Sequence, residues 1–416
     1  MITVEVILKA CEVQRQKYLS MNQDGIKRAV DKNFLTPVPS FARIITGVRR
    51  CGKSTTVKMS FLKQGAFYLN FEDTSLYEFK TSDFNILNDA IEQYEKNNSC
   101  KYLCFDEIQS IKGWEVFVRR KLEENYLVVV TGSNASLLSW ELGTKLTGRH
   151  LDYEMFPFSF EEFCRFKKIK SSADNFFEYL KTGGFPEAIK NKSQEILQRL
   201  FDDILTRDIA VRHSIRDIRT LKILGLYLAS NCANLITGAK LSAQLGLKTN
   251  VTILEYLSYL EQSYLFFFVP KFSYSAKAQS ISPKKVYCID TGMIQDVTLS
   301  LNGDIGRLFE NAVFIELRRH TKNIWYYAES SFECDFLYGQ NIVPEIALQV
   351  CYKLTNENRE REVQGLIKTV KKISNLKLFI VTFNQKDKIS YNGITIEVIP
   401  AVEFFKQKKQ TIIKIK

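Results

Sequence analysis

The sequence is poor in the residues that build metal centres and disulfide frameworks. It contains three histidines, and its nine cysteines are scattered without any Cys-x-x-Cys pair. Both features argue against a zinc site or a disulfide scaffold and indicate reduced thiols. Long apolar runs are also missing, since none approaches the about 20 residues that a membrane-spanning helix needs. Residues 1–8 carry no basic leader, so we expect no signal peptide, no membrane partner and a cytoplasmic location.

What the sequence does contain is typical of a globular protein with several domains. The chain has 416 residues, of which 45% are hydrophobic and 25% are charged. At roughly 100–200 residues per domain, this length indicates about two to four domains. The net charge of +12 favours a polyanionic partner such as nucleic acid, although the basic residues form only small clusters along the chain.

Residues 47–54 carry the most informative motif in the chain. They fit the pattern G-x-x-x-x-G-K-[ST], the loop that binds the phosphates of ATP or GTP. The glycines let the backbone turn its N–H groups onto phosphate oxygens, the lysine supplies positive charge, and the serine hydroxyl can hold Mg²⁺. A buried strand is predicted before the loop at 43–46 and a helix after it at 54–62, which is the context this loop requires. The residues expected around the nucleotide are Gly47, Val48, Arg49, Arg50, Cys51, Gly52, Lys53, Ser54 and Thr55.

A second motif completes a nucleotide site. Residues 101–107 form an apolar run that ends in Asp106 and Glu107, as a buried parallel strand does where its carboxyl end opens onto a ligand crevice. Asp106 is predicted to order Mg²⁺, and Glu107 is predicted to polarise the attacking water. A further strand at 127–131 leads to Ser133, which either senses the γ-phosphate or lies in an ordinary turn.

The remaining pattern of the chain predicts how the elements follow one another. Residues 1–32 are predicted to be helical. Residues 40–165 alternate short strands, such as 67–71, with helical stretches, which indicates a nucleotide-binding βαβ domain with a mainly parallel sheet. Residues 166–215 are predicted to be helical, with a break at the paired glycines 183–184.

Residues 218–290 have the element order of a winged helix-turn-helix. Two helices, a tight turn and a third helix capped by Thr249 precede two predicted strands at 265–269 and 285–289. In that fold the helix from Asn250 would read DNA. Its sequence is poor in arginine and lysine, however, so we predict the winged-helix fold without sequence-specific reading.

Residues 304–416 are predicted to form a third unit of mixed α/β structure. An amphipathic helix is expected at 307–319 and a crossover helix at 359–374. The predicted strands of this unit span 324–327, 333–337, 346–350 and 378–382.

These motifs together resemble one family throughout the chain. It comprises prokaryotic P-loop ATPases that join an AAA-like domain to a C-terminal domain of restriction-endonuclease-like fold, the AAA_14 plus DUF4143 type. The resemblance rests on residues 47–55, 105–109, 131–134, 146–149, 156–163, 183–186, 203–208, 287–292, 309–314 and 334–336, in that order. It implies an α/β protein with an N-terminal helical segment (1–34), a P-loop ATPase domain (35–165), a helical lid (166–215), a winged-helix domain (216–300) and a nuclease-like domain (301–416).

The resemblance also implies ATP as the nucleotide and adds three site residues. ATP agrees with the missing Asn/Thr-Lys-x-Asp motif that reads guanine. Pro186 follows Gly184 in the lid, where a Gly-x-Pro either packs near the adenine or only breaks a helix. Arg149 and Arg207 either neutralise charge in the transition state, from the same or a neighbouring subunit, or form structural ion pairs.

The nuclease-like domain departs from the pattern of an active enzyme. Nucleases of this fold place an Asp on one strand, and a Glu or Asp, one further residue and a Lys on the next, to hold Mg²⁺ and the scissile phosphate. Asp335 fits the first position, with Glu310 or Glu316 as a helper, but Gln349 and Cys351 stand at the other two. Because an amide is a poor Mg²⁺ ligand, we predict a degenerate nuclease fold used for binding or assembly.

Three functions fit these observations. The first is a Mg²⁺-dependent ATPase whose nucleotide state, ATP or ADP, switches a nucleic-acid partner, a protein partner or another copy of the chain. In this function Lys53 binds phosphate and Glu107 positions water. The second is a nuclease gated by ATP, and the missing Glu-x-Lys pair counts against it. The third is a signalling or DNA-binding switch without hydrolysis, and the Asp106–Glu107 pair counts against that.

Overall fold

The described part of the chain forms two compact units. The computed structural model describes residues 1–20, 25–30, 34, 36, 38–98, 100–135, 146, 148–246, 250–298 and 304–406. The first unit comprises residues 1–156 and the second residues 157–416. The finer division into five parts stays a prediction. None of the described helices combines the length and apolar character needed to cross a membrane.

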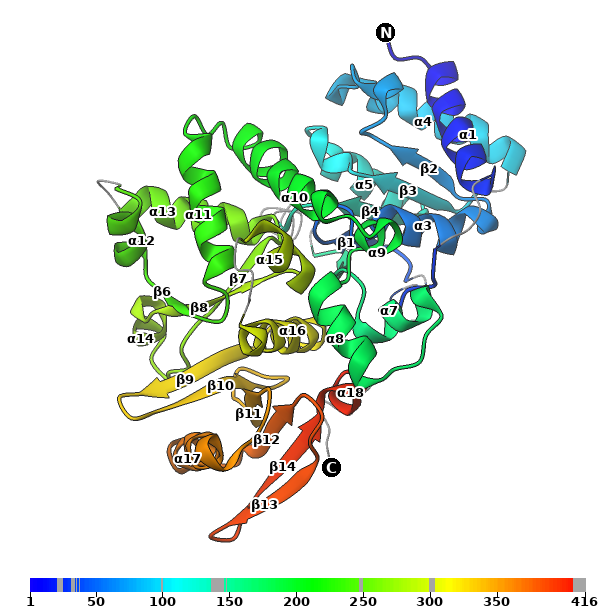
Figure 1. Ribbon diagram of the computed structural model, residues 1–416. Helices are drawn as coiled ribbons and strands as arrows, with labels where there is room; N and C mark the ends of the chain where they lie inside the picture. The colour runs from blue at the N-terminus through cyan, green and yellow to red at the C-terminus, as the bar shows by residue number, and fades with distance from the viewer. Residues whose placement is uncertain are drawn as a thin grey trace. The chain divides into compact units, whose positions relative to one another are not determined.

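The first unit is built on a five-stranded parallel sheet (Figure 1). Its strands are β1 (Ala42–Thr46), β2 (Phe67–Asn70), β3 (Tyr102–Asp106), β4 (Leu127–Gly132) and β5 (His150–Glu154), in the order β2-β3-β4-β1-β5. The three central strands are almost wholly buried, as their runs of Ile, Leu and Val predict for a sheet covered on both faces. Since the strands are parallel, the segments that follow β1, β3 and β4 meet at one edge.

Helices and short 3₁₀ turns connect these strands. The helices are α1 (Val4–Ser20), α3 (Lys53–Phe61), α4 (Phe84–Asn98) and α5 (Trp114–Glu123), and the turns are η1 (Leu62–Gln64), η2 (Thr74–Leu76), η3 (Thr81–Asp83) and η4 (Ile108–Ser110). Helix α1 packs on the edge strand β2 and on α4 (Figure 1). The Gln14 side chain accepts a 2.9 Å hydrogen bond from the Asn70 amide, so α1 also pairs with backbone of the edge strand.

The second unit begins with a helical region. It contains α7 (Phe160–Lys167), α8 (Ala173–Thr182), α9 (Pro186–Asn191), α10 (Gln194–Asp203) and the π-helical turn η6 (Ile204–Val211). This confirms the helical prediction for 166–215, including the break at the two glycines. Next come α11 (Ile218–Ser230), β6 (Leu235–Ile236), α12 (Gly238–Gln244), α13 (Asn250–Gln262), β7 (Phe266–Val269), α14 (Ala276–Ile281), β8 (Lys284–Cys288) and α15 (Thr291–Val297). The three strands form an antiparallel sheet in the order β6-β8-β7.

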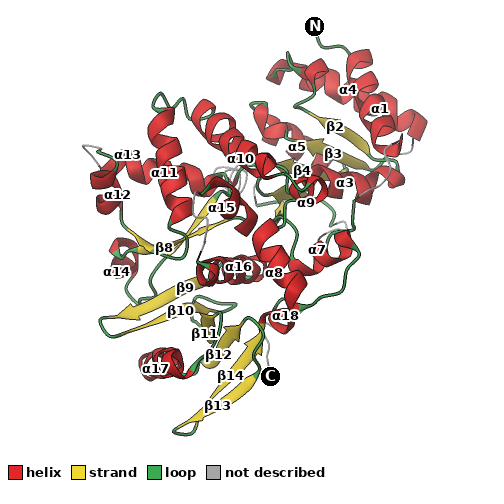
Figure 2. Cartoon of the chain, in the orientation of Figure 1, coloured by secondary structure: helices red, strands yellow, loops and turns green. Residues whose placement is uncertain are grey.

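A six-stranded mixed sheet completes the second unit (Figure 2). Its elements are α16 (Ile305–His320), β9 (Ile324–Glu329), β10 (Phe332–Tyr338), β11 (Ile346–Cys351), α17 (Asn356–Lys372), β12 (Lys377–Thr382), β13 (Asp387–Tyr391), β14 (Ile394–Pro400) and α18 (Ala401–Phe404). The strand order is β13-β14-β12-β11-β10-β9. Helix α17 crosses over between the parallel strands β11 and β12 and packs on β10 and β11, as the sequence predicts.

Some sequence predictions were wrong or incomplete. The helix predicted over 1–32 holds for Val4–Ser20, but residues 25–30 have no regular structure, and Arg28 in this segment bonds to the backbone carbonyls of Cys51 and Phe156. The strands β5, β6, β13 and β14 were not predicted. The three helices and two strands predicted in 218–290 are present in the predicted order, with β6 and α14 in addition, and the name winged helix stays a prediction. Residues 21–24 and 31–32 of the predicted helix, Thr147 of the 146–149 motif and the cap Thr249 lie outside the described residues.

Candidate nucleotide site

The loop at residues 47–52 joins β1 directly to α3, and its two glycines have positive φ values. Gly52 has a φ of 104°, and α3 begins at the next residue, so the helix N-terminus opens onto the loop. A Cβ at Gly47 would lie 2.0 Å from the Met155 carbonyl oxygen, which only glycine avoids. The predicted phosphate loop is therefore present in outline, with strand, turn and helix in the required order.

Lys53 lies at the start of α3 with its side chain turned back over the loop. Its ammonium donates to the carbonyl oxygens of Gly47 at 2.9 Å and of Val48 at 3.1 Å. The same nitrogen lies 3.9 Å from Oε1 of Glu107, and the lysine is 5% exposed. Phosphate oxygens would compete with these carbonyls for the same ammonium, because charged acceptors make stronger hydrogen bonds than neutral ones.

Asp106 ends β3 and is completely buried. Tyr68 of β2 donates to Oδ2 of its carboxylate, and Thr131 of β4 donates to Oδ1. Burial, and then the charge of Asp106, raise the pKa of Tyr68 well above its usual value. The two flanking strands thus fix the orientation of the carboxylate. Sequence patterns gave no signal for this, because both donors lie far from Asp106 in the chain.

Glu107 directly follows Asp106 and has a φ of 57°, in the left-handed region. Its Oε2 accepts hydrogen bonds from the backbone and hydroxyl of Ser133, both at 3.2 Å, and from the Gln109 amide. Ser133 follows β4, so the parallel sheet brings it to Glu107 as strand order requires. The prediction of Ser133 as a phosphate sensor stays a prediction. In the structure its contact is with Glu107.

Arg28 is a residue of this site that the sequence analysis missed. Its guanidinium donates to the carbonyl of Cys51 at 2.7 Å and to that of Phe156 at 2.7 Å. Elsewhere in the loop, Arg49 pairs with Glu72 at 2.9 Å. A motif search covers only the loop itself, whereas Arg28 lies before β1 in the chain and reaches the loop through the fold.

Three further predicted site residues are Arg149 in the first unit and Pro186 and Arg207 in the second. Arg149 is about half exposed and lies 3.9 Å from Glu123, an exposed pair that fits the structural alternative. Arg207 is exposed on η6, and Pro186 opens α9. Both belong to the second unit, whereas the phosphate loop belongs to the first. Their roles at the nucleotide stay predictions.

The paired glycines before Pro186 have a structural explanation within the second unit. The Gly184 amide donates to Asp290 at 2.6 Å, and Asp290 also caps α15 by accepting from the Met293 amide at 3.0 Å. A Cβ at Gly183 would lie 2.0 Å from the Asp290 carboxylate. Burial raises the pKa of Asp290 to about 6. The turn is thus fitted closely against the start of α15.

We expect Gly184→Ala to destabilise the protein. The new Cβ would lie 2.3 Å from the carbonyl oxygen of Phe158. This oxygen is a backbone atom, so it cannot move aside without a shift of the main chain. Overpacking of this kind costs about 1–3 kcal/mol. Chemical denaturation measures the loss. Gly238→Ala is the matched control, because its Cβ would meet only Leu254 at 3.4 Å, an ordinary contact. Equal stability of the two variants would contradict the expectation.

A buried cluster of charges lies in the second unit. Lys285 of β8 contacts Asp335 at 3.0 Å, Glu310 at 3.1 Å and Glu333 at 2.6 Å. Burial alone would lower the pKa of Lys285, but these carboxylates raise it well above its usual value, and burial raises the pKa of Glu310 to about 7. Tyr287 also donates to Glu310, at 2.7 Å. The cluster is therefore held together by an internal ammonium.

The residues predicted from the nuclease pattern fall partly into this cluster. Gln349 accepts from the Asp335 amide at 3.1 Å, and Glu310 joins through Lys285, whereas Glu316 pairs with Arg319 at 3.3 Å instead. Cys351 donates to the Lys353 carbonyl. Within the described ranges, no group of three or more His, Cys, Asp or Glu side chains is arranged to hold a metal ion. The restriction-endonuclease-like fold stays a prediction.

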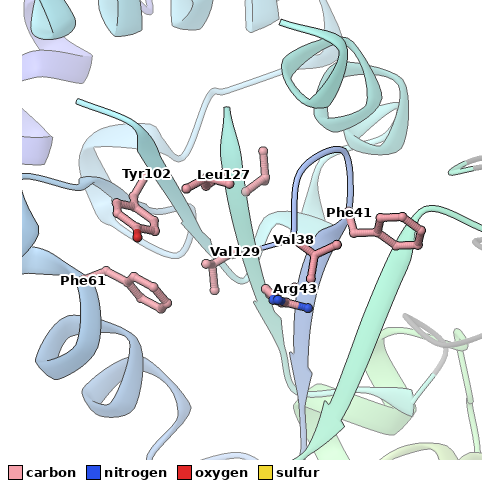
Figure 3. Close-up of a pocket in the computed structure, with 8 residues that line it drawn as sticks. Val38, Phe41, Arg43, Phe61, Tyr102, Leu127 and Val129 are labelled. Carbon is pink, nitrogen blue, oxygen red and sulfur yellow. The ribbon is translucent and has the colours of Figure 1, made fainter. Parts of the chain in front are cut away.

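A small pocket in the first unit lies away from the phosphate loop. Its lining comes from the amino ends of β1, β3 and β4 and from neighbouring segments (Figure 3), comprising Val38, Phe41, Arg43, Phe61, Tyr102, Leu127, Val128 and Val129. The phosphate loop follows the carboxyl end of β1, at the opposite edge of the sheet. This mainly apolar pocket is thus separate from the candidate nucleotide site.

Comparison with known proteins identifies an AAA domain in residues 40–164. This interval contains the phosphate loop and the Asp106–Glu107 pair, and it confirms the AAA part of the resemblance. Residues 173–303 match a domain of unknown function, DUF8612. The predicted DUF4143 assignment is not confirmed.

Two relatives match most of the chain. An uncharacterized protein of Methanocaldococcus jannaschii is 36% identical over 396 residues, covering 87% of this chain and 88% of its own. An uncharacterized protein of Haemophilus influenzae is 30% identical over 388 residues, covering 88% of this chain and 94% of its own.

Among solved structures, AMPPCP-bound DnaA from Aquifex aeolicus gives a TM-score of 0.26 at 12% identity, covering 62% of this chain and 87% of its own. PCH-2 of C. elegans gives 0.22 at 14%, covering 62% and 66%. Similarity this low carries no conclusion about this chain.

Proposed function

Because this chain belongs to a family of AAA-domain proteins that includes the archaeal and bacterial relatives, we propose that it is a Mg²⁺-dependent ATPase. It hydrolyses ATP to ADP and phosphate and couples its nucleotide state to a partner. The observation that carries the proposal is the convergence of Lys53, Asp106 and Glu107 at one edge of a parallel sheet, where Lys53 lies 3.9 Å from Glu107. A lysine for phosphate and a carboxylate for water are the two groups that hydrolysis needs.

Each residue has a distinct role in this reaction. Backbone N–H groups of the loop and the ammonium of Lys53 bind the phosphate oxygens and stabilise the negative charge that develops on them. Glu107 orients the attacking water and accepts its proton. The oxygen of that water bonds to the γ-phosphorus, while the bond to the bridging oxygen breaks and its electron pair stays on ADP.

The oxygen donors at the site fit a magnesium ion. The hydroxyl of Ser54 and the carboxylate of Asp106 are hard ligands of the type that Mg²⁺ prefers, and Mg²⁺ commonly keeps several of its waters. Asp106 is fully buried and accepts from Tyr68 and Thr131, and its carboxylate would help to hold the ion with the Ser54 hydroxyl. When bound, the ion would neutralise phosphate charge.

The test is phosphate release from ATP by the purified full chain. We expect release with Mg²⁺ that falls to background when EDTA removes the metal and when Lys53→Ala removes the phosphate-binding ammonium. Lys63→Ala is the matched control, because Lys63 is an exposed lysine of the same unit in η1. A wild type that binds no ATP, or that hydrolyses it equally well after Lys53→Ala, would overturn the proposal.

We propose a protein, in preference to DNA, as the coupled partner. The helix α13, which would read DNA in a winged helix, exposes Val251 (64%) and Leu254 (58%) and has no arginine or lysine within its bounds. DNA binding relies on basic side chains that neutralise phosphates. Phosphate release should therefore be indifferent to double-stranded, single-stranded or branched DNA. A rise with any one form would make DNA the partner.

A further inference from the structure

Gln109 lies next to the residue that the proposed ATPase uses to activate water. It ends the 105–109 motif, and no role has been assigned to it above. It is on the turn η4, two residues after Glu107. Its Nε2 donates to Oε2 of Glu107. Its Oε1 is buried and has no hydrogen-bond partner among the described residues. Among the described residues, the side-chain amide of Gln109 therefore makes its hydrogen bond to Glu107.

The two oxygens of Glu107 have different surroundings. Oε2 receives all three donors, two from Ser133 and one from Gln109. Oε1 faces the ammonium of Lys53 at 3.9 Å, on the side of the phosphate loop. Because Oε2 is fixed by donors that come from two different segments, the carboxylate has little freedom to rotate, and Oε1 stays directed toward the phosphates.

We infer that Gln109 is a positioning residue for ATP hydrolysis. Its amide holds Oε2 of Glu107, so that Oε1 points to the place where the attacking water must lie. Ser133 shares this task through its hydroxyl and backbone amide. A buried amide with an unpartnered oxygen is costly to the fold. A leucine of similar volume would avoid that cost, which is consistent with a functional use of the amide. This role rests on the proposed function.

The amide orientation follows from charge. Turning the amide over would place Oε1 of Gln109 against the Glu107 carboxylate, with acceptor facing acceptor. The carboxylate therefore selects the donor. Gln109→Glu keeps the shape of the side chain and removes the donor. The same reasoning therefore predicts that it lowers the rate of ATP hydrolysis, as Gln109→Leu does.

The experiment compares steady-state ATP hydrolysis by wild type, Gln109→Leu and Gln109→Glu. Misplacing a reacting group can cost up to about a hundredfold, so we expect kcat to fall about tenfold or more, with KM within about twofold of wild type. The matched control is Gln93→Leu, because Gln93 is an exposed glutamine on α4. Single-turnover rates are also measured for Glu107→Gln with and without Gln109→Leu. The second substitution should then add nothing, since no carboxylate is left to orient.

The outcomes separate the two proposals. If the wild type hydrolyses ATP and both Gln109 variants keep its kcat, the positioning role is overturned and the proposed ATPase function stands. A further tenfold loss on adding Gln109→Leu to Glu107→Gln has the same consequence, since it indicates a structural role instead. A wild type that binds ATP but releases no phosphate overturns the ATPase and the positioning role together. If Gln109→Leu fails to fold, the shape-conserving Gln109→Glu decides the question.

Discussion

Replacing Lys285 by methionine should destabilise the protein by about 3–5 kcal/mol, the cost of breaking a buried ion pair by removing one partner. The substitution removes the ammonium that contacts both Asp335 and Glu310, in a place where the Lys285 side chain itself is 4% exposed. Because the pKa of Lys285 is raised, its ammonium is fully charged at neutral pH, and its contribution is lost only as pH rises through that raised value. Measurement at pH 7 therefore compares the variant with a wild type whose lysine is fully charged.

Chemical denaturation of the full chain gives the loss, and the neighbouring residue supplies the control. Lys284→Met makes the same substitution one position earlier on β8, at an exposed side chain, and should change stability by less than about 0.5 kcal/mol. Adding Asp335→Asn to Lys285→Met should restore part of the loss, since one uncompensated charge is removed. If both lysine variants are equally stable, the cluster does not support the fold as described.

Replacing Glu107 by glutamine should lower the rate of phosphate release at least about a hundredfold, because a positioned general base contributes roughly 10²–10⁴ to a rate. The amide keeps the shape of the carboxylate but cannot accept the proton of the attacking water. ATP binding should survive, since the phosphates are bound by the loop and by Lys53. Release kinetics and equilibrium binding of ATP, measured on the same sample, distinguish these two effects.

The control for this substitution lies in the same unit. Glu92→Gln changes an exposed carboxylate on α4 and should leave hydrolysis within about twofold of wild type, as is usual for surface positions. Hydrolysis that continues at the wild-type rate in Glu107→Gln would remove Glu107 from the reaction. It would then leave the site without an identified base.

The strand–loop–helix around the phosphate loop and the strand β3 were predictable because their signals are local. A glycine-rich loop between a strand and a helix needs no distant contact to be recognised, and the run that ends in Asp106 and Glu107 is equally self-contained. The partners that hold these residues were not predictable. Tyr68 and Thr131 reach Asp106, and Arg28 reaches Cys51, only because the strand order places them there.

Lys285 shows the limit of motif reasoning in the second unit. The nuclease pattern directs attention to the strand after Asp335, where Gln349 and Cys351 stand. The lysine that meets Asp335 comes from β8, 50 residues earlier, and no spacing rule connects them. A search confined to the motif therefore concludes that the cation is absent, although the fold supplies it from another sheet.

One missed element did carry a local signal. Asn392 and Gly393 join β13 to β14 with φ values of 49° and 80°, and an Asn-Gly pair between alternating residues is a strong hairpin signature. The strand β5 was harder to recognise, because its sequence from His150 to Glu154 is mostly polar. Only its pairing with β1 makes it a strand.

The origin of Lys285 on β8 also bears on how this protein can change over generations. The ammonium belongs to the three-stranded sheet, whereas its carboxylates belong to α16 and β10. Backbone bonds from Phe272 to Tyr326 and from Tyr326 to Pro270 tie the same two regions together. Recombination with a breakpoint between β8 and α16 would take the lysine from one parent and its carboxylates from the other. We therefore expect viable chimaeras between relatives to inherit residues 284–338 as one block.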